Sequence, residues 1–174
     1  MAEIFVVRHG ETVENSQRIC QGQTEGTLTS NGIAQAEAVA KQLSQYKLQA
    51  IYTSPLKRAR ITAEIVQKYQ SEAPIFELKH LMERGMGEME GKKFPDNFDY
   101  TAPIKDAEPL TDMFNRVVES LNFIAQSHPN QQVAIVTHGI TIRMIKCYIQ
   151  NIPLDKLNEI ELQGNGTYFS VQID

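Results

Sequence analysis

The sequence has no tryptophan and only two cysteines among its 174 residues. Cys20 and Cys147 lie far apart and lack the spacing of metal ligands, which favours two unreactive thiols in a reducing compartment over a disulfide scaffold. No apolar run is long enough to cross a bilayer, and Met1 is not followed by the features of a secretory signal. We therefore expect a cytoplasmic protein that does not bind membranes.

A large excess of charge of either sign is also missing. The chain has 17 basic and 21 acidic residues, for a net charge of −4, and the basic residues are scattered along it. Nothing in this pattern favours nucleic acid or anionic lipid as a partner. With 41% hydrophobic residues, the chain has the size and composition of one domain. We expect a single domain over residues 1–174 that acts on a small molecule or on a protein.

Short apolar runs alternate with amphipathic helical patterns along the chain. Continuous apolar runs at 4–7, 50–53, 74–78 and 133–137 are typical of strands that are covered on both faces. Helical patterns between or after them indicate βαβ units. The fold class that we predict is therefore α/β, a three-layer αβα sandwich with a mainly parallel sheet of about five or six strands.

Capping residues predict where the helices begin. We expect N-caps at Thr29 or Ser30, at Ser54 ahead of Pro55, and at Thr111.

The remaining segments include one more helix, a last strand and a long loop. The helix is expected to follow Gly139, and residues 167–173 are expected to form a terminal strand. Residues 91–109, with three prolines and mixed charges, read as an irregular loop. We predict that this segment, about 91–110, is a short lid.

Two histidines leave predicted strands at equivalent points. Arg8-His9-Gly10 follows the first strand and His138-Gly139 follows a later one. Ligands of doubly wound sheets bind beyond the carboxyl ends of strands, and glycine there lets backbone N–H groups approach an anion. Arg8 and Arg58 supply guanidinium groups that match phosphoryl oxygens. The pattern predicts a phosphate site.

Several segments occur in one order that resembles the histidine phosphatase superfamily, the phosphoglycerate mutase-like group. Residues 21–22 and 28–36 extend the resemblance over nearly the whole chain. It implies a phosphoglycerate mutase-like fold and phosphoryl transfer without a metal or an organic cofactor. The segments that carry it are Arg8–Thr12 with Asn15, Ser54–Ala59, Leu81–Glu83 ahead of Gly87–Gly91, and Thr137–Gly139.

The resemblance also implies roles for individual residues. His9 is the expected nucleophile, which forms a phosphohistidine. Arg8, Arg58 and His138 are expected to surround the nonbridging phosphoryl oxygens. Glu83 is expected to protonate the leaving oxygen and then to activate water. Two arginines near His9 favour its neutral form, whereas the protonation of His138 depends on the bound anion and stays open.

Five further positions are expected to bind substrate, and for Asn15 the resemblance implies a contact with phosphate. They are Asn15, the Gly10 backbone, Gln21, Gly22 and Gly139.

Other interpretations of the charged residues stay open at this stage. Glu88 or Glu90 could replace Glu83 as the acid, because all three lie in one acidic stretch. A metal site made of His9, Glu11 and His138 is disfavoured, because no HExxH or cysteine-rich pattern accompanies them.

The loops favour hydrolysis over a mutase reaction. A mutase must shield its phosphohistidine from water, yet only about twenty residues separate Gly91 from the next helix. Gln23 and Met89 occupy positions where the family's mutases have tryptophan. We predict a phosphomonoester hydrolase that acts on a small phosphorylated metabolite or a phosphoprotein. The alternatives are a phosphoglycerate mutase-type phosphotransferase and a non-catalytic module that binds phospho-ligands.

Overall fold

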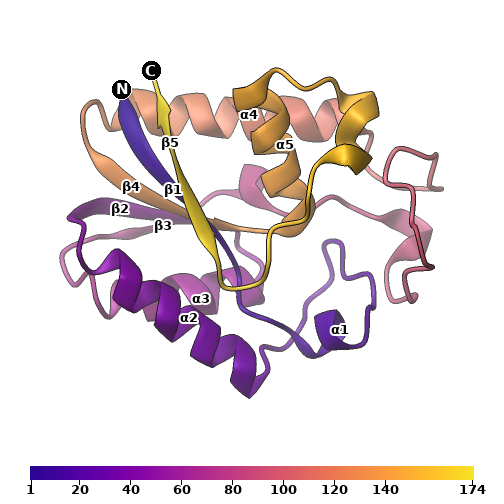
Figure 1. Ribbon diagram of the computed structural model, residues 1–174, viewed down its shortest axis with the longest axis horizontal. Helices are drawn as coiled ribbons and strands as arrows, with labels where there is room; N and C mark the ends of the chain where they lie inside the picture. Colours follow the sequence, from indigo (N-terminus) through magenta and orange to yellow (C-terminus); the bar gives the residue numbers. More distant parts are fainter.

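The computed structural model describes residues 1–174 and has three layers around a central sheet (Figure 1). The strands lie in the order β3-β2-β4-β1-β5. The first four are mutually parallel, and β5 is antiparallel to β1 at one edge. The expected mainly parallel sheet is thereby confirmed. The strands are β1 (Ala2–Arg8), β2 (Leu48–Thr53), β3 (Ile75–Glu77), β4 (Gln132–Thr137) and β5 (Tyr168–Ile173).

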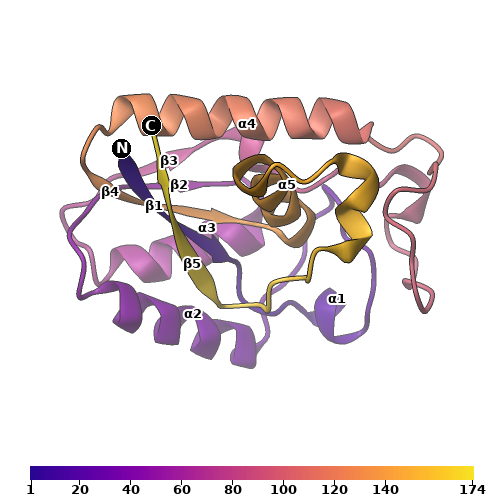
Figure 2. The ribbon, with the colours of Figure 1, turned by 45° about the horizontal axis from the view of Figure 1, so that its top comes forward.

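Helices cover both faces of the sheet. Helices α2 and α3 lie against one face, and α4 and α5 lie against the other (Figures 1 and 2). The α-helices are α1 (Val13–Ser16), α2 (Ser30–Leu43), α3 (Lys57–Gln67), α4 (Leu110–Ser127) and α5 (Gly139–Gln150). Three 3₁₀ turns, η1 (Lys79–Leu81), η2 (Gly87–Met89) and η3 (Leu154–Glu159), complete the regular structure. None of the helices combines the length and apolar character that a membrane span requires.

The two faces of the sheet carry separate hydrophobic cores. Ile4 and Val6 of β1 belong to the core under α4 and α5, and Phe5 and Val7 belong to the core under α2 and α3. All four side chains are at most 1% exposed, and burying each one contributes roughly 1.5–3 kcal/mol. Burial on both faces is the reason why β1 is apolar without alternation.

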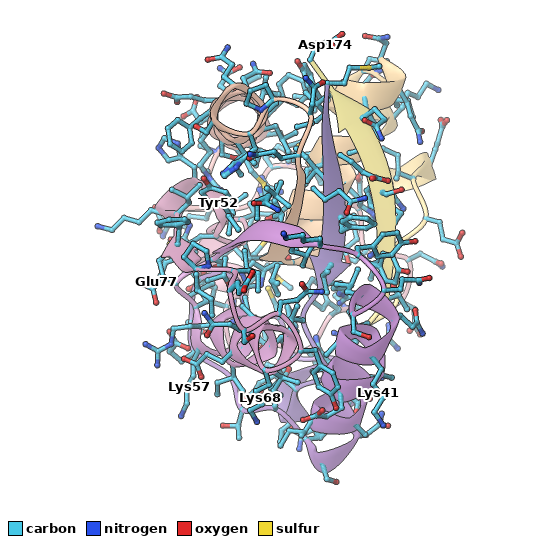
Figure 3. All side chains as sticks on the ribbon, turned by 90° about the vertical axis from the view of Figure 1, so that its left-hand side faces the viewer. Lys41, Tyr52, Lys57, Lys68, Glu77 and Asp174 are labelled. Carbon is cyan, nitrogen blue, oxygen red and sulfur yellow. The ribbon has the colours of Figure 1, made fainter.

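The outer sides of the helices are polar. Figure 3 shows Lys41 of α2, Lys57 at the start of α3 and Lys68 just beyond its end projecting away from the sheet. All three residues are exposed. This division into an apolar inner face and a charged outer face produces the helical periodicity of the sequence.

The N-cap expected for α2 is confirmed. The Thr29 side chain accepts the Gly32 N–H at 2.9 Å, and the helix begins at Ser30. Gly32 disfavours a helix but is required by packing, because a Cβ there would lie 2.0 Å from the Glu11 carbonyl oxygen. Conversely, a Cβ on Gly10 would lie 2.2 Å from the Gly32 carbonyl oxygen. The two glycines let the loop after β1 contact the first turn of α2.

The N-cap expected at Ser54 is wrong. Helix α3 begins at Lys57 with Leu56 as its N-cap and has no side-chain cap. The Ser54 hydroxyl does accept a backbone N–H, that of Leu56 at 3.2 Å, but it also contacts His138. The turn from β2 into α3 therefore holds the Ser54 hydroxyl next to His138 instead of capping the helix.

The N-cap expected at Thr111 is also wrong. Helix α4 begins at Leu110, and its N-cap is Pro109, two residues ahead of the expected position. The fixed φ of proline, −58° here, suits the entry to a helix. Ser127 is the last residue of the helix, directly ahead of His128-Pro129, because the residue before a proline disfavours the helical conformation.

Residues 91–109 form an irregular loop, as expected. None of them belongs to a helix or a strand, although Lys93 makes an isolated bridge to Ile19. The loop lies at the end of the molecule opposite the two termini (Figures 1 and 2).

Candidate active site

Three adjacent strands end at one cluster of polar side chains. His9 follows β1, His138 follows β4 and Ser54 follows β2. Strand β4 lies between the other two, and the register pairs the last residues of β1 and β4, Arg8 and Thr137. The ring centroids of His9 and His138 are consequently 5.1 Å apart, and the Ser54 hydroxyl oxygen is 2.8 Å from His138 Nε2. The parallel sheet places the two predicted histidines side by side.

The His9 ring has a fixed tautomer. Its Nδ1 lies 2.7 Å from the Gly10 carbonyl oxygen. Because a carbonyl can only accept, Nδ1 carries the proton and Nε2 keeps a lone pair in the neutral ring. Burial, together with the charges of Arg58 and Arg8, holds the pKa of His9 well below its ordinary value. Nε2 is therefore available as a nucleophile.

His138 also has one ring nitrogen in a hydrogen bond and one without a partner. The Ser54 hydroxyl accepts from Leu56, so it can donate its proton to His138 Nε2. Nδ1 then carries the ring proton, and this buried atom has no hydrogen-bond partner. Burial, then the neighbouring Arg58, lowers the pKa of His138 well below its ordinary value. Without a ligand the His138 ring is therefore neutral, with Nδ1–H as a free donor. A bound anion would favour the protonated ring.

The two buried rings make stability depend on pH. In the unfolded chain they take up protons near pH 6.5, whereas His9 and His138 stay neutral in the folded protein. We expect the free energy of unfolding to be unaffected by these groups above pH 6.5. It should fall between pH 6.5 and 5.5 by up to about 1.4 kcal/mol per pH unit for each ring.

Urea unfolding at a series of pH values measures this dependence. His128→Ala, which changes a histidine outside the site, should retain the slope, and His138→Asn should reduce it. A free energy of unfolding that stays constant across this pH range contradicts the expectation.

Arg8 and Arg58 bring two buried charges to the histidines. Arg58 is 1% exposed and donates to the carbonyls of Thr24 and Gly22, both at 2.8 Å. Arg8 donates to the Gln163 carbonyl. Both Nε atoms are buried without a partner, and neither guanidinium forms a salt bridge. Burial lowers the pKa of each arginine. Buried guanidinium groups that form no salt bridge are a preorganised site for an anion.

Glu83 is held at the amino end of α5. Its Oε2 accepts the Ile140 N–H at 3.0 Å, and its Oε1 accepts the N–H groups of Thr141 at 3.1 Å and Arg84 at 3.0 Å. These backbone donors hold the two side-chain oxygens of Glu83 in place. Of the three acidic residues considered for proton transfer, the structure brings Glu83 to the cavity.

Glu88 and Glu90 do not line the cavity. Glu90 Oε1 instead accepts the N–H groups of Gln23 and Met86, both at 3.0 Å. Glu90 therefore stabilises the loops around the site, and Glu83 is the sole carboxylate of the cavity wall.

A cavity of about 490 Å³ is lined by His9 together with Arg8, Arg58 and Glu83, whereas His138 lies behind His9 and does not line it. Four of the residues expected to bind substrate line it: Asn15, Gln21, Gly22 and Gly139. Asn15 Oδ1 accepts the Thr12 N–H at 3.1 Å, which fixes the orientation of its amide. The buried Gln21 Oε1 has no partner.

The Gly10 backbone donor expected from the sequence is engaged elsewhere. Its N–H donates to the Thr62 hydroxyl of α3 at 3.1 Å, and its carbonyl accepts from His9. Gly10 does not line the cavity. We correct that assignment: Gly10 fixes the His9 tautomer and permits close packing with α2.

The metal alternative finds no support in the geometry. His9 and His138 lie together, but the Glu11 carboxylate accepts from the Thr29 hydroxyl at 2.9 Å, at the start of α2. No group of three or more histidine, cysteine or acidic side chains is arranged as metal ligands.

Sequence reasoning missed several residues of the site. Asn165 donates to the His9 carbonyl at 3.1 Å and to Asn15 Oδ1 at 3.2 Å. Its only signal was a position between two glycines. Phe94, Phe98 and Tyr100 form one wall of the cavity, with ring centroids 4.9–5.9 Å apart. Their close spacing within the irregular loop could have indicated a cluster.

The family model of the histidine phosphatase superfamily, branch 1, matches residues 4–174. This chain belongs to the histidine phosphatase superfamily. The uncharacterized phosphatase PhoE of Bacillus subtilis is 36% identical over 152 residues, which cover 83% of this chain and 76% of that protein. Phosphoserine phosphatase 1 of Hydrogenobacter thermophilus is 32% identical over 168 residues, or 90% of this chain and 80% of that one.

Two further known proteins are also similar to this chain. The probable phosphoglycerate mutase GpmB of Serratia proteamaculans is 29% identical, with coverage of 88% of this chain and 77% of that protein. The solved structure of YhfR from Bacillus stearothermophilus superposes with a TM-score of 0.91 at 30% identity, covering 100% of this chain and 92% of that one. The family and the fold expected from the sequence are confirmed.

Proposed function

We propose that this histidine phosphatase superfamily member hydrolyses phosphomonoesters through a phosphohistidine on His9. The observation that carries the proposal is the state of the His9 ring. Nδ1 donates to Gly10, which leaves the Nε2 lone pair free in a ring that burial and two arginines keep neutral. A neutral nucleophile beside unpaired guanidinium groups suits attack on a phosphoryl group.

In the first half-reaction, His9 Nε2 attacks phosphorus, so that a P–N bond forms and the bond to the leaving oxygen breaks. A protonated Glu83 transfers its proton to that oxygen. Arg8, Arg58 and the free Nδ1–H of His138 donate to the nonbridging oxygens, where charge develops. The organic alcohol leaves, and the phosphoryl group stays on the histidine.

In the second half-reaction, water attacks the phosphohistidine. Glu83, now a carboxylate, takes one proton from the water as its oxygen bonds to phosphorus and the P–N bond breaks. Inorganic phosphate is released, His9 regains its neutral ring and Glu83 is protonated again. The cycle balances without a metal or an organic cofactor.

Two observations favour hydrolysis over transfer to a second hydroxyl. The loop over the cavity, residues 91–109, is short, and we propose that it is a lid too small to exclude water. PhoE, a relative named as a phosphatase, is 36% identical, whereas two relatives named for phosphoglycerate mutase are 33% and 29% identical. Both observations support a phosphatase.

The apolar wall of the cavity indicates what kind of organic group the substrate carries. Phe94, Phe98 and Tyr100 face the cavity together with Met86 and Leu162. Such a wall suits a bulky group on the ester oxygen, whether that of a small phosphorylated metabolite or of a phosphoprotein.

Phe98→Ala tests this wall. We expect the variant to raise KM for 2-phenylethyl phosphate by roughly 5- to 30-fold, because about 1–2 kcal/mol of apolar contact is lost. KM for ethyl phosphate should not change, since it lacks the ring. Phe123→Ala, an exposed phenylalanine of α4 outside the cavity, is the matched control. Equal changes for both esters would argue against the wall.

The proposed function is tested by phosphate release in EDTA from p-nitrophenyl phosphate and a panel of phosphorylated metabolites and peptides. Multiple turnovers are expected for at least one compound. Activity that needs a bisphosphate primer and releases little phosphate would identify a phosphotransferase instead. A folded protein that binds phosphate and turns over no compound would overturn the proposal in favour of a binding module.

A further inference from the structure

An arginine outside the cavity holds the backbone that carries Glu83. Arg116 lies in the second turn of α4 and does not line the cavity. Its Nη1 donates to the carbonyls of His80 at 2.7 Å and Met82 at 2.8 Å, and its Nη2 donates to the Glu83 carbonyl at 3.1 Å. One guanidinium therefore fixes three carbonyls within four consecutive residues.

The same guanidinium forms a bidentate ion pair. Arg116 Nε and Nη2 donate to the two carboxylate oxygens of Glu108 at 2.6 and 2.8 Å. The two side chains are only 15% and 19% exposed. Every nitrogen of the Arg116 fork is engaged, so the side chain has a single geometry.

Glu108 links this arrangement to the loop over the cavity. Its Oε2 also accepts the Gly85 N–H at 3.3 Å, and its carbonyl accepts from Arg84 Nε at 2.8 Å. Arg84 Nη1 donates in turn to the carbonyl of Tyr100, a residue of the cavity wall, at 2.9 Å. Arg84 and Gly85, which follow Glu83, are thus bonded to the loop of residues 91–109, near its end at Glu108 and in its middle at Tyr100.

An ion pair that is largely shielded from water is a poor means of stabilising a fold, because an apolar pair of similar volume is often as stable. The guanidinium instead fixes the course of the backbone from η1 to Glu83, where Met82 and Glu83 belong to no helix or strand. The Glu83 carboxylate is held by α5 and its backbone is held by α4 through Arg116. Two helices on the same face of the sheet thereby determine one side-chain position.

We propose that Arg116 is a positioning residue for proton transfer, which acts through Glu83 and not through contact with substrate. This inference rests on the proposed role of Glu83. Loss of the Arg116 guanidinium leaves the carbonyls of residues 80, 82 and 83 without their donor and lets the backbone at Glu83 move. A displaced acid should slow those esters whose leaving oxygen must be protonated.

A double-mutant cycle tests the proposal, with kcat/KM measured for ethyl phosphate and p-nitrophenyl phosphate. We expect Arg116→Met to lower kcat/KM about 10- to 100-fold for ethyl phosphate, the range found when outer residues that orient an active group are removed. The loss should be only a few-fold for p-nitrophenyl phosphate, whose leaving group needs little protonation. In a Glu83→Gln background, Arg116→Met should cause almost no further loss for ethyl phosphate.

The controls separate positioning from stability. Gln70→Ala removes a buried side chain that bonds to the carbonyls of Leu43 and Tyr46 and to the Leu48 N–H, at the amino end of β2. It should lower the Tm but leave the ratio of the two kcat/KM values unchanged. If Arg116→Met does not fold, Arg116→Lys, which keeps the charge but loses the fork, takes its place in the same cycle.

Equal losses for the two esters, or a full additional loss in the Glu83→Gln background, would overturn the inference while the proposed function stands. A wild-type protein that releases no phosphate from any ester would overturn the proposed function and this inference with it.

Discussion

His9→Ala is expected to lower kcat/KM for every phosphomonoester by about 10⁴-fold or more, the scale seen when an enzyme loses its nucleophile. The physical reason is that no other group near the cavity offers an unprotonated nitrogen in this position. His138 is the sole other histidine in the cluster, and its Nε2 is bound to Ser54. Without His9 the displacement has no covalent route.

Phosphate release measures the loss, and trapping the phosphoenzyme identifies its cause. The wild-type protein, quenched in alkali during turnover, should carry one acid-labile phosphoryl group that His9→Ala lacks. His80→Ala, at a half-exposed histidine outside the cavity, is the matched control and should retain activity. Persistent activity in His9→Ala would eliminate the phosphohistidine route.

Glu83→Gln should have the second-largest effect. It is expected to lower kcat/KM for alkyl phosphates by about 10²- to 10³-fold, within the usual contribution of general acid catalysis. Glutamine has nearly the same shape, but its single oxygen can replace only one of the two carboxylate oxygens that accept N–H groups from α5. The contrast between alkyl and aryl esters, and not the size of the loss, therefore reports proton transfer. For p-nitrophenyl phosphate, kcat/KM should fall much less, because its leaving group departs without a proton.

The second half-reaction should still be slow in Glu83→Gln, since water then lacks its base. Rapid mixing with p-nitrophenyl phosphate should therefore give a burst of p-nitrophenol of about one equivalent, followed by slow turnover. Glu88→Gln, at an exposed glutamate of the same acidic stretch, is the control. A uniform loss for alkyl and aryl esters, without a burst, would assign Glu83 a role in binding instead of proton transfer.

Much of the fold could be predicted because its signals are local. The runs around Ile4 and Val133 are apolar on both faces, and this pattern occurs where helices cover both sides of a sheet. The start of α2 could be predicted because the Thr29 side chain accepts an N–H from the first turn of that helix. Ser54 and Thr111 misled the prediction, because a serine or threonine ahead of a helix looks like a cap whatever its hydroxyl actually contacts.

The site could be predicted in part for the same reason. His9 and His138 each follow a strand, and carboxyl ends of parallel strands meet at one edge, so their proximity followed once a parallel sheet was expected. Glu83 could not be separated from Glu88 and Glu90 by sequence spacing. That choice depends on which carboxylate reaches the amino end of α5, nearly sixty residues further along the chain.

The sequence by itself determined the class of fold, the two histidines and the arginines, because hydrophobic periodicity and residue chemistry belong to short segments. The tertiary structure alone decided the tautomer of His9, the use of the Gly10 N–H by Thr62, and the fixing of the Glu83 backbone by Arg116. These features depend on the rotation, register and distance of side chains on separate elements. The length of a hydrogen bond can vary by only a few tenths of an ångström, and its angle is similarly restricted. These bonds therefore form only when the layers pack together.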